Sequence, residues 1–115
     1  MSLAAYKRTQ GTTETARGTE HRLLAEITGE MIQAQKTNMA GPALAPVLHR
    51  NREMWNTFSA DCAVKGNGLP PELRASLISI SLWVDRFTSD VIMGRDTVDA
   101  LITVNRNIMD GLKQG

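Results

Sequence analysis

Residues 69–87 read LPPELRASLISISLWVDRF, and this stretch decides the fold. Its paired prolines are typical of the first turn of a helix, where a missing backbone N–H costs little. Apolar residues then repeat at steps of four and three, which places them on one side of an α-helix: Leu73, Leu77, Ile80, Val84, Phe87 and Val91. A second apolar side is formed by Ile78, Leu82, Trp83 and Ile92. We therefore expect this helix to be central, covered by its own neighbours or by a partner.

Three further helices are indicated by apolar stripes on either side of it. They span about residues 19–37, 42–64 and 96–112. The second should begin between Pro42 and Pro46, since proline is tolerated in a first helical turn. Gly94 is the expected C′ residue of the third helix and Asp96 the expected N-cap of the fourth. The turn between them is short, so neighbouring helices should be antiparallel. The prediction is an all-α fold, a small bundle of three to four long antiparallel helices.

The first 18 residues differ from the rest. Residues 11–18 are rich in Thr and Gly, and neither Leu3 nor Tyr6 continues an apolar stripe of the bundle. We expect two parts, an N-terminal arm at residues 1–18 that is mobile or docked on a neighbour, and the helical bundle at residues 19–115.

Composition excludes several classes of function. The chain has 115 residues with 13 basic and 12 acidic side chains, a net charge of +1, and only five aromatic residues. Direct binding of nucleic acid is therefore not expected. No apolar run approaches the ~20 residues of a membrane span, and no signal peptide is recognisable. The single cysteine, Cys62, fits a reducing compartment, so we expect a cytoplasmic protein.

Candidate catalytic residues are few. His21 and His49 fall on different helices and lack partners at metal-ligand spacing. The carboxylates of Glu26 and Glu30 fit a solvated helix face, and Cys62 fits a small buried hydrophobe. We therefore expect no catalytic residue, no metal and no cofactor, and thus no enzyme.

Two asparagines stand where apolar residues are expected. Asn51 lies between Leu48 and Trp55 on the stripe of the second helix, and Asn105 has the same position on the fourth. A buried amide must be hydrogen-bonded, since an unpaired one costs about 1–3 kcal/mol. Each amide either fixes the packing of its own helix or contacts a partner inside an apolar groove. Trp55 and Trp83 present the same choice between core and interface.

The chain resembles the FlaF family of flagellar biosynthesis regulators. The matching segments are SLAAY at residues 2–6, NREMWNTFSADCAVKGNGLPPELRASLISISLWV at 51–84 and ALITVNRNIMDGL at 100–112. The resemblance implies a non-enzymatic protein that binds flagellin as a chaperone or adaptor in the cytoplasm. It also implies that flagellin production is promoted together with the regulator FlbT.

The partners expected from this resemblance are flagellin and, as a further candidate, FlbT; self-association stays open. The alternative is direct post-transcriptional control of flagellin messenger RNA. The candidate partner-binding residues are Leu3, Tyr6, Asn51, Arg52, Trp55 and Trp83.

Overall fold

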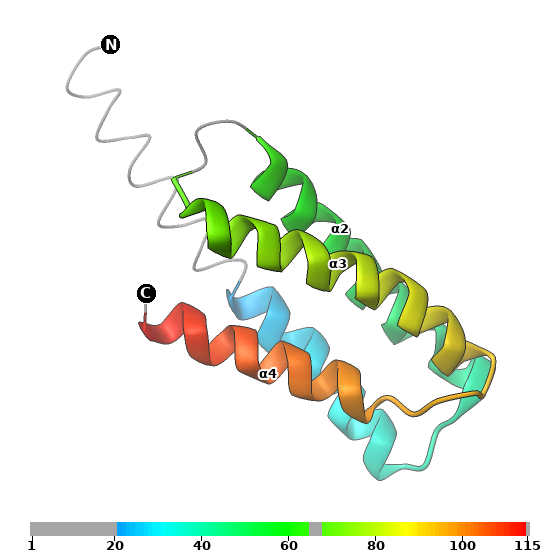
Figure 1. The fold of residues 1–115 in the computed structure, drawn as a ribbon. Coiled ribbons are helices and arrows are strands. Elements are labelled where there is room, and N and C mark those ends of the chain that lie inside the picture. Colours follow the sequence, from blue (N-terminus) through cyan, green and yellow to red (C-terminus); the bar gives the residue numbers. More distant parts are fainter. Residues whose placement is uncertain (1–20, 65–67, 115) are drawn as a thin grey trace.

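The computed structural model describes residues 21–64 and 68–114, and these parts contain helices and no strand. The first helix is described over residues 21–36. A 3₁₀ turn, η1 (Gly41–Leu44), leads into α2 (Ala45–Ala63), which is followed by α3 (Pro71–Ile92) and α4 (Asp99–Gln114) (Figure 1). The prediction of an all-α bundle of long helices is confirmed. The proposed arm, with Leu3 and Tyr6, lies outside the described residues.

Two helices end in a left-handed residue, as their sequences require. The first helix ends at Asn38 (φ 57°), and the Met39 N–H donates to the carbonyl of Ala34 at 3.0 Å. α3 ends in the same way at Gly94 (φ 77°), with the Arg95 N–H bonded to the carbonyl of Asp90 at 2.8 Å. Both ends are Schellman motifs, in which the left-handed residue closes the last turn. Gly94 is thus the C′ residue predicted for α3.

Helix starts follow the prolines, whereas the predicted N-cap of the fourth helix is wrong. Pro42, Pro46 and Pro71 each stand in the first turn of η1, α2 or α3. α4 begins only at Asp99. The carboxylate of Asp96 accepts the Thr97 N–H at 2.9 Å, so it stabilises the turn before the helix. An N-cap side chain would instead reach two or three residues ahead.

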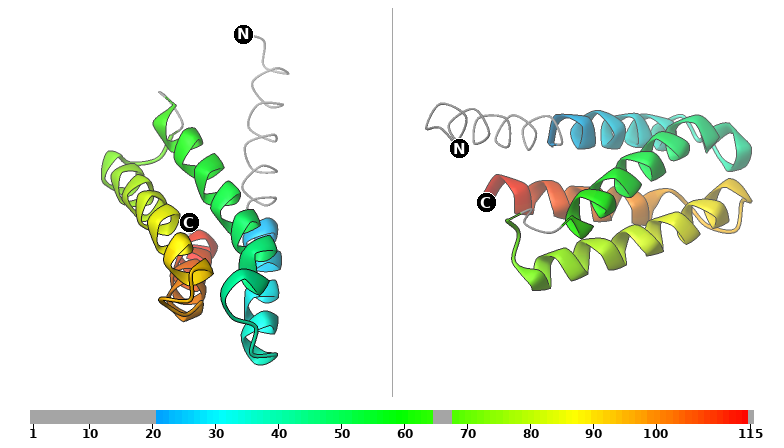
Figure 2. Two further views of the ribbon diagram at one scale, coloured as in Figure 1. Left: turned by 90° about the vertical axis from the view of Figure 1, so that its right-hand side faces the viewer. Right: turned by 90° about the horizontal axis from the view of Figure 1, so that it is seen from above.

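The helices form a four-helix arrangement in which sequence neighbours run antiparallel (Figures 1 and 2). Arg52 of α2 bonds to Asp85 and Ser89 of α3, and Ser81 of α3 bonds back to the Trp55 carbonyl of α2. Because the earlier residue of one helix meets the later residue of the other, α2 and α3 form a helical hairpin. α4 lies antiparallel to the first helix by the same argument, since Asp99 meets Gln35 and Asn105 meets Thr28.

Each described helix turns one side toward the core. Its fully buried large side chains are Leu24, Ile27, Met31, Leu48, Trp55, Val84, Val91 and Leu101. The expectation of a central third helix is wrong, because α3 has a solvent-facing side that includes Ala75, Ser79 and Leu82. Leu82 is 61% exposed. Periodicity showed that α3 is apolar on two sides. Of the neighbouring residues Leu82 and Trp83 on the second apolar side, Leu82 faces solvent and Trp83 is half-buried.

Candidate partner-binding site

Four polar side chains from three helices meet in the centre of the bundle. Asn105 of α4 donates through Nδ2 to Oδ1 of Asn51 at 2.8 Å and to Oγ1 of Thr28 at 3.1 Å. Its Oδ1 accepts the indole N–H of Trp55 at 2.9 Å. Both asparagines are 0% exposed. The prediction that they are buried and bonded to another helix is confirmed, and we call these four residues the central polar network.

The donor and acceptor atoms of the central polar network can be assigned from the chemistry of the indole. An indole can only donate, so Asn105 must turn its Oδ1 to Trp55 and its Nδ2 to Asn51. Asn51 then accepts with Oδ1, and its own Nδ2 is buried without a hydrogen-bond partner in the described chain. Thr28 was not predicted, although it stands between Leu24 and Met31 on an apolar stripe, which is the signal that identified Asn51.

The side chains of Trp55 and Arg52 contact other residues of the bundle. Trp55 is 0% exposed and packs edge-on against Phe58, with ring centroids 5.8 Å apart. Arg52 reaches across to α3, where its Nη2 donates to the carbonyl of Asp85 and to Oγ of Ser89, both at 2.9 Å. In this conformation Asn51 and Trp55 offer no surface to a partner, and Arg52 acts as a link between α2 and α3.

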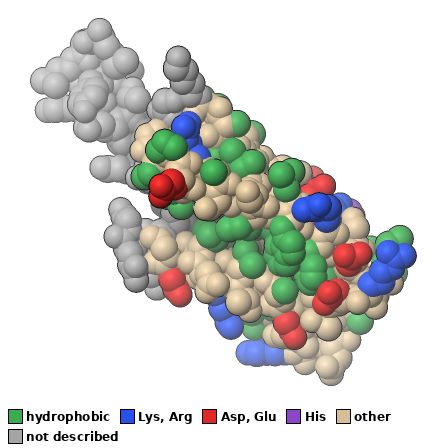
Figure 3. Space-filling view, in the orientation of Figure 1, with side chains coloured by type: hydrophobic (Ala, Val, Ile, Leu, Met, Phe, Trp, Pro, Cys, Tyr) green, Lys and Arg blue, Asp and Glu red, His purple; other side chains and the backbone are tan. Residues whose placement is uncertain are grey.

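Trp83 lies on the side of α3 turned away from Asp85 and Ser89, the residues that contact Arg52 of α2. Its ring stacks on that of Phe87, with centroids 4.7 Å apart and an interplanar angle of 20°. Ile80 precedes these two residues on the same side of α3, and Val104 and Ile108 lie on the side of α4 turned away from the first helix. All five are half-buried. We call them the α3–α4 seam, and hydrophobic side chains gather over these two helices in Figure 3.

The polar contacts between helices lie at other boundaries of the bundle. Arg50 pairs with Glu30 between α2 and the first helix, and Arg52 ties α2 to α3. Gln35 donates to Asp99 between the first helix and α4. None of these bonds joins α3 to α4, and the half-buried residues of the seam on these two helices are all apolar. A half-buried apolar strip along two helices, without polar side chains to pair, can receive another apolar surface.

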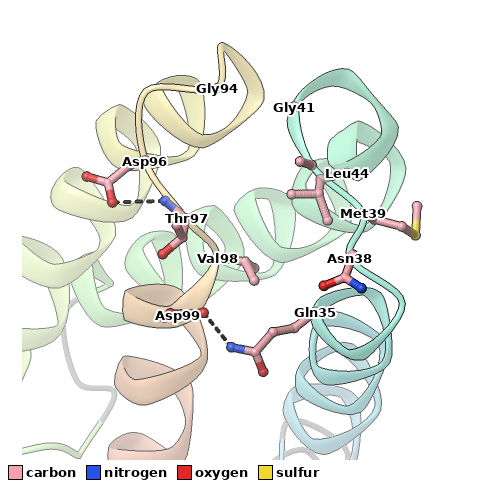
Figure 4. A pocket seen from close by; sticks show the side chains of 11 residues that line it. Gln35, Asn38, Met39, Gly41, Leu44, Gly94, Asp96, Thr97, Val98 and Asp99 are labelled. Carbon is pink, nitrogen blue, oxygen red and sulfur yellow. Dashed lines mark hydrogen bonds between the residues drawn. The ribbon is translucent and has the colours of Figure 1, made fainter.

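A pocket lies at the end of the bundle where two turns meet (Figure 4). It encloses about 350 Å³ and is lined by the turn after the first helix and the turn before α4. Gln35 and Asp99 bond across it, and the Asp96 carboxylate is held by the Thr97 N–H. Its volume is at the lower end for a ligand pocket. Most of its lining is exposed loop, so it does not enclose a ligand as a binding pocket does.

The residues considered for chemistry are dispersed. The described chain holds no group of three or more His, Cys, Asp or Glu side chains that could bind a metal ion. Cys62 is buried, as predicted for a small hydrophobe, and Glu30 is exposed and paired with Arg50. Among the described helices, none has the length and apolar character needed to cross a membrane.

A family model described as flagellar protein FlaF matches residues 2–112, nearly the whole chain. The chain therefore belongs to the FlaF family and has a role in flagellar biosynthesis. This family is a flagellar one and is not known to contain enzymes. No curated protein and no solved structure matches the chain.

Proposed function

We propose that this protein binds flagellin in the cytoplasm as a chaperone or adaptor and promotes flagellin production and assembly together with FlbT. Membership of the FlaF family supports a flagellar role. The observation that carries the binding step is the α3–α4 seam, a strip of half-buried apolar side chains along two helices.

A terminal helix of flagellin fits the chemistry of this strip. Flagellin, in the family picture, has long terminal helices that need cover until assembly. An amphipathic helix docks through anchors at three- and four-residue spacing, and a groove between two helices can receive them. Trp83 and Phe87 stand four residues apart on α3 and supply a stacked aromatic surface for such anchors.

Calorimetry tests this function with purified chain, full-length flagellin and flagellin lacking each terminal helix. We expect binding to full-length flagellin and its loss when the helix that docks is removed. Equal binding to full-length and doubly truncated flagellin, or binding to neither, contradicts the proposal. Binding should change little with salt concentration, because the seam is uncharged. If the chain binds messenger RNA and this binding weakens steeply as the salt concentration rises, the result would support the messenger RNA alternative.

Two neighbouring residues give a matched pair of variants for this experiment. Trp83→Ala removes the central anchor of the seam and should weaken flagellin binding about tenfold or more. Leu82→Ala removes a larger exposed fraction of side chain on the solvent-facing side of the same helix and should leave binding unchanged. Equal losses in both variants would place the contact elsewhere. Circular dichroism of both variants shows whether each one keeps its helices.

A further inference from the structure

Acidic residues of α3 stand beyond both ends of the α3 part of the seam. On α3, Glu72, Ile80, Trp83, Phe87 and Asp90 follow steps of four and three with Ser76 between the first two, so they lie along one side of the helix. The middle of this row is apolar and its two ends are acidic. Asp90 already lies 3.9 Å from Arg95, whereas Glu72 is exposed and forms no ion pair with any described residue. An occupant with apolar anchors followed by a positive charge at the Glu72 end would match it.

The N-terminal segment of this chain has that pattern. Residues 1–8 read MSLAAYKR, with Leu3 and Tyr6 three positions apart and Lys7 and Arg8 directly after them. No acidic residue occurs before Glu14. The apolar pair is thus complementary to the apolar seam, and the adjacent positive charges are complementary to Glu72 beyond its end.

The connection to the bundle has the right direction and length. His21 lies at the end of the bundle where α4 finishes and α3 begins, because the first helix runs antiparallel to α4 (Figure 1). Tyr6 is 15 residues away, which spans about 50 Å when extended and about 22 Å as a helix. Either length exceeds the ~10–12 Å diameter of α4 that the chain has to cross. A chain entering from this end brings Lys7 and Arg8 to Glu72 first and Tyr6 and Leu3 deeper into the seam.

We propose that residues 3–8 dock on the α3–α4 seam of their own molecule, with Leu3 and Tyr6 against its apolar residues and the two bases beside Glu72. The segment then covers the aromatic pair Trp83 and Phe87 until a partner displaces it. The docking itself is independent of any partner. Its regulatory consequence, competition with flagellin, rests on the function proposed above.

Paramagnetic relaxation tests the docking without flagellin. A nitroxide label is placed at Ser2→Cys in the full chain carrying Cys62→Ala, and backbone amide signals are recorded. We expect broadening at residues 77–87 of α3 and 104–108 of α4. Broadening confined to the first helix, or none, would overturn the proposal. A mixture of labelled chains with isotope-enriched unlabelled chains should show no such broadening, since its appearance would mean that the segment docks on a second copy.

A second measurement keeps Cys62 and needs no label. Acrylamide quenching reports on Trp83, because Trp55 is 0% exposed. The double variant Leu3→Ser and Tyr6→Ser should raise quenching if the segment covers Trp83, and unchanged quenching would contradict docking. The matched control is Thr12→Ser and Thr13→Ser, which changes the same segment outside the proposed contact and should leave quenching as it is.

The regulatory consequence is tested separately by calorimetry with full-length flagellin. The Leu3→Ser and Tyr6→Ser chain should bind flagellin more tightly than the natural chain, because a competing segment has been removed. Weaker binding would show that Leu3 and Tyr6 contact flagellin directly and would overturn the competition. Because the relaxation and quenching experiments contain no flagellin, a failure of the flagellin-binding function does not affect their result.

Discussion

Asn105 Nδ2 donates a hydrogen bond of 2.8 Å to Asn51 Oδ1 and joins α4 to α2 through the centre of the bundle. The two residues are 54 positions apart in the chain and both are 0% exposed. A single polar contact between buried amides therefore sets how two helices far apart in the sequence face each other. A shift of either helix by one residue would turn one amide toward apolar neighbours.

The two asparagines should contribute unequally to stability. Asn105→Leu leaves the Trp55 N–H and the whole amide of Asn51 unpaired, whereas Asn51→Leu removes a nitrogen that is already unpaired and leaves Asn105 bonded to Thr28 and Trp55. We expect Asn105→Leu to lower the free energy of unfolding by roughly 1–3 kcal/mol more than Asn51→Leu. Urea denaturation measures both. Equal costs would mean that the hydrogen bonds of Asn105 do not carry the difference.

The bond between Trp55 and Asn105 predicts coupling between their variants. Once Asn105→Leu has removed the acceptor, Trp55→Phe no longer breaks a hydrogen bond. The losses of unfolding free energy in the two single variants should therefore sum to about 1 kcal/mol more than the loss in the double variant. Trp83→Phe combined with Asn105→Leu is the control and should be additive, since Trp83 lies on the seam. Additivity in both cycles would argue against the bond.

Two glycines should respond to alanine with opposite signs. Gly94 has φ 77° and a Cβ there would meet no atom within 4 Å, so Gly94→Ala incurs backbone strain alone. That strain costs roughly 1–2 kcal/mol. Gly29 lies within the first helix, also with open space around it, and Gly29→Ala should raise stability by about 0.5–1 kcal/mol. Thermal unfolding of both variants decides this, and a stabilising Gly94→Ala would contradict the Schellman end of α3.

Arg52 and Arg50 should differ in their tolerance of lysine. Arg52 donates through Nη2 to a carbonyl and a hydroxyl of α3 while its Nε lies 3.2 Å from Oδ1 of Asp85, and a single ammonium cannot occupy both nitrogen positions. Arg52→Lys should cost about 1 kcal/mol of unfolding free energy. Arg50 forms an exposed pair with Glu30, so Arg50→Lys should have almost no effect. Comparable losses in urea denaturation would show that Arg52 is no more than a surface ion pair.

Local sequence patterns predicted the features that depend on neighbouring residues. Gly94 and Pro71 are governed by backbone conformation within one turn, and both stand where they were expected. The two asparagines were recognised because polar residues interrupted apolar stripes. Thr28 carried the same signal, but a hydroxyl can bond to its own helix, and Thr28 does so to the carbonyl of Leu24 at 2.6 Å. Its place in the network depends on α4, which its local sequence does not reveal.

The sequence alone did not show that Trp55 is buried while Trp83 is only half-buried, or that α3 lies at the edge of the bundle. Both tryptophans stand among apolar residues, and the difference between them is set by which helices lie alongside. Trp55 faces α4 across the bundle, while Trp83 lies at the seam where α3 and α4 meet the surface. Leu82 likewise faces solvent because α3 stands at the edge of the bundle. These are tertiary properties, which a one-dimensional pattern does not contain.

Nuclear magnetic resonance tests directly whether flagellin binds at the α3–α4 seam, as proposed above. Peptides of the flagellin terminal helices are added to isotope-enriched full chain while amide signals are followed. We expect shifts concentrated at residues 80–87 of α3 and 104–108 of α4, with little change at Ala75 and Ser79 on the solvent-facing side of α3. Shifts concentrated on that solvent-facing side, or no shifts with either peptide, would contradict it.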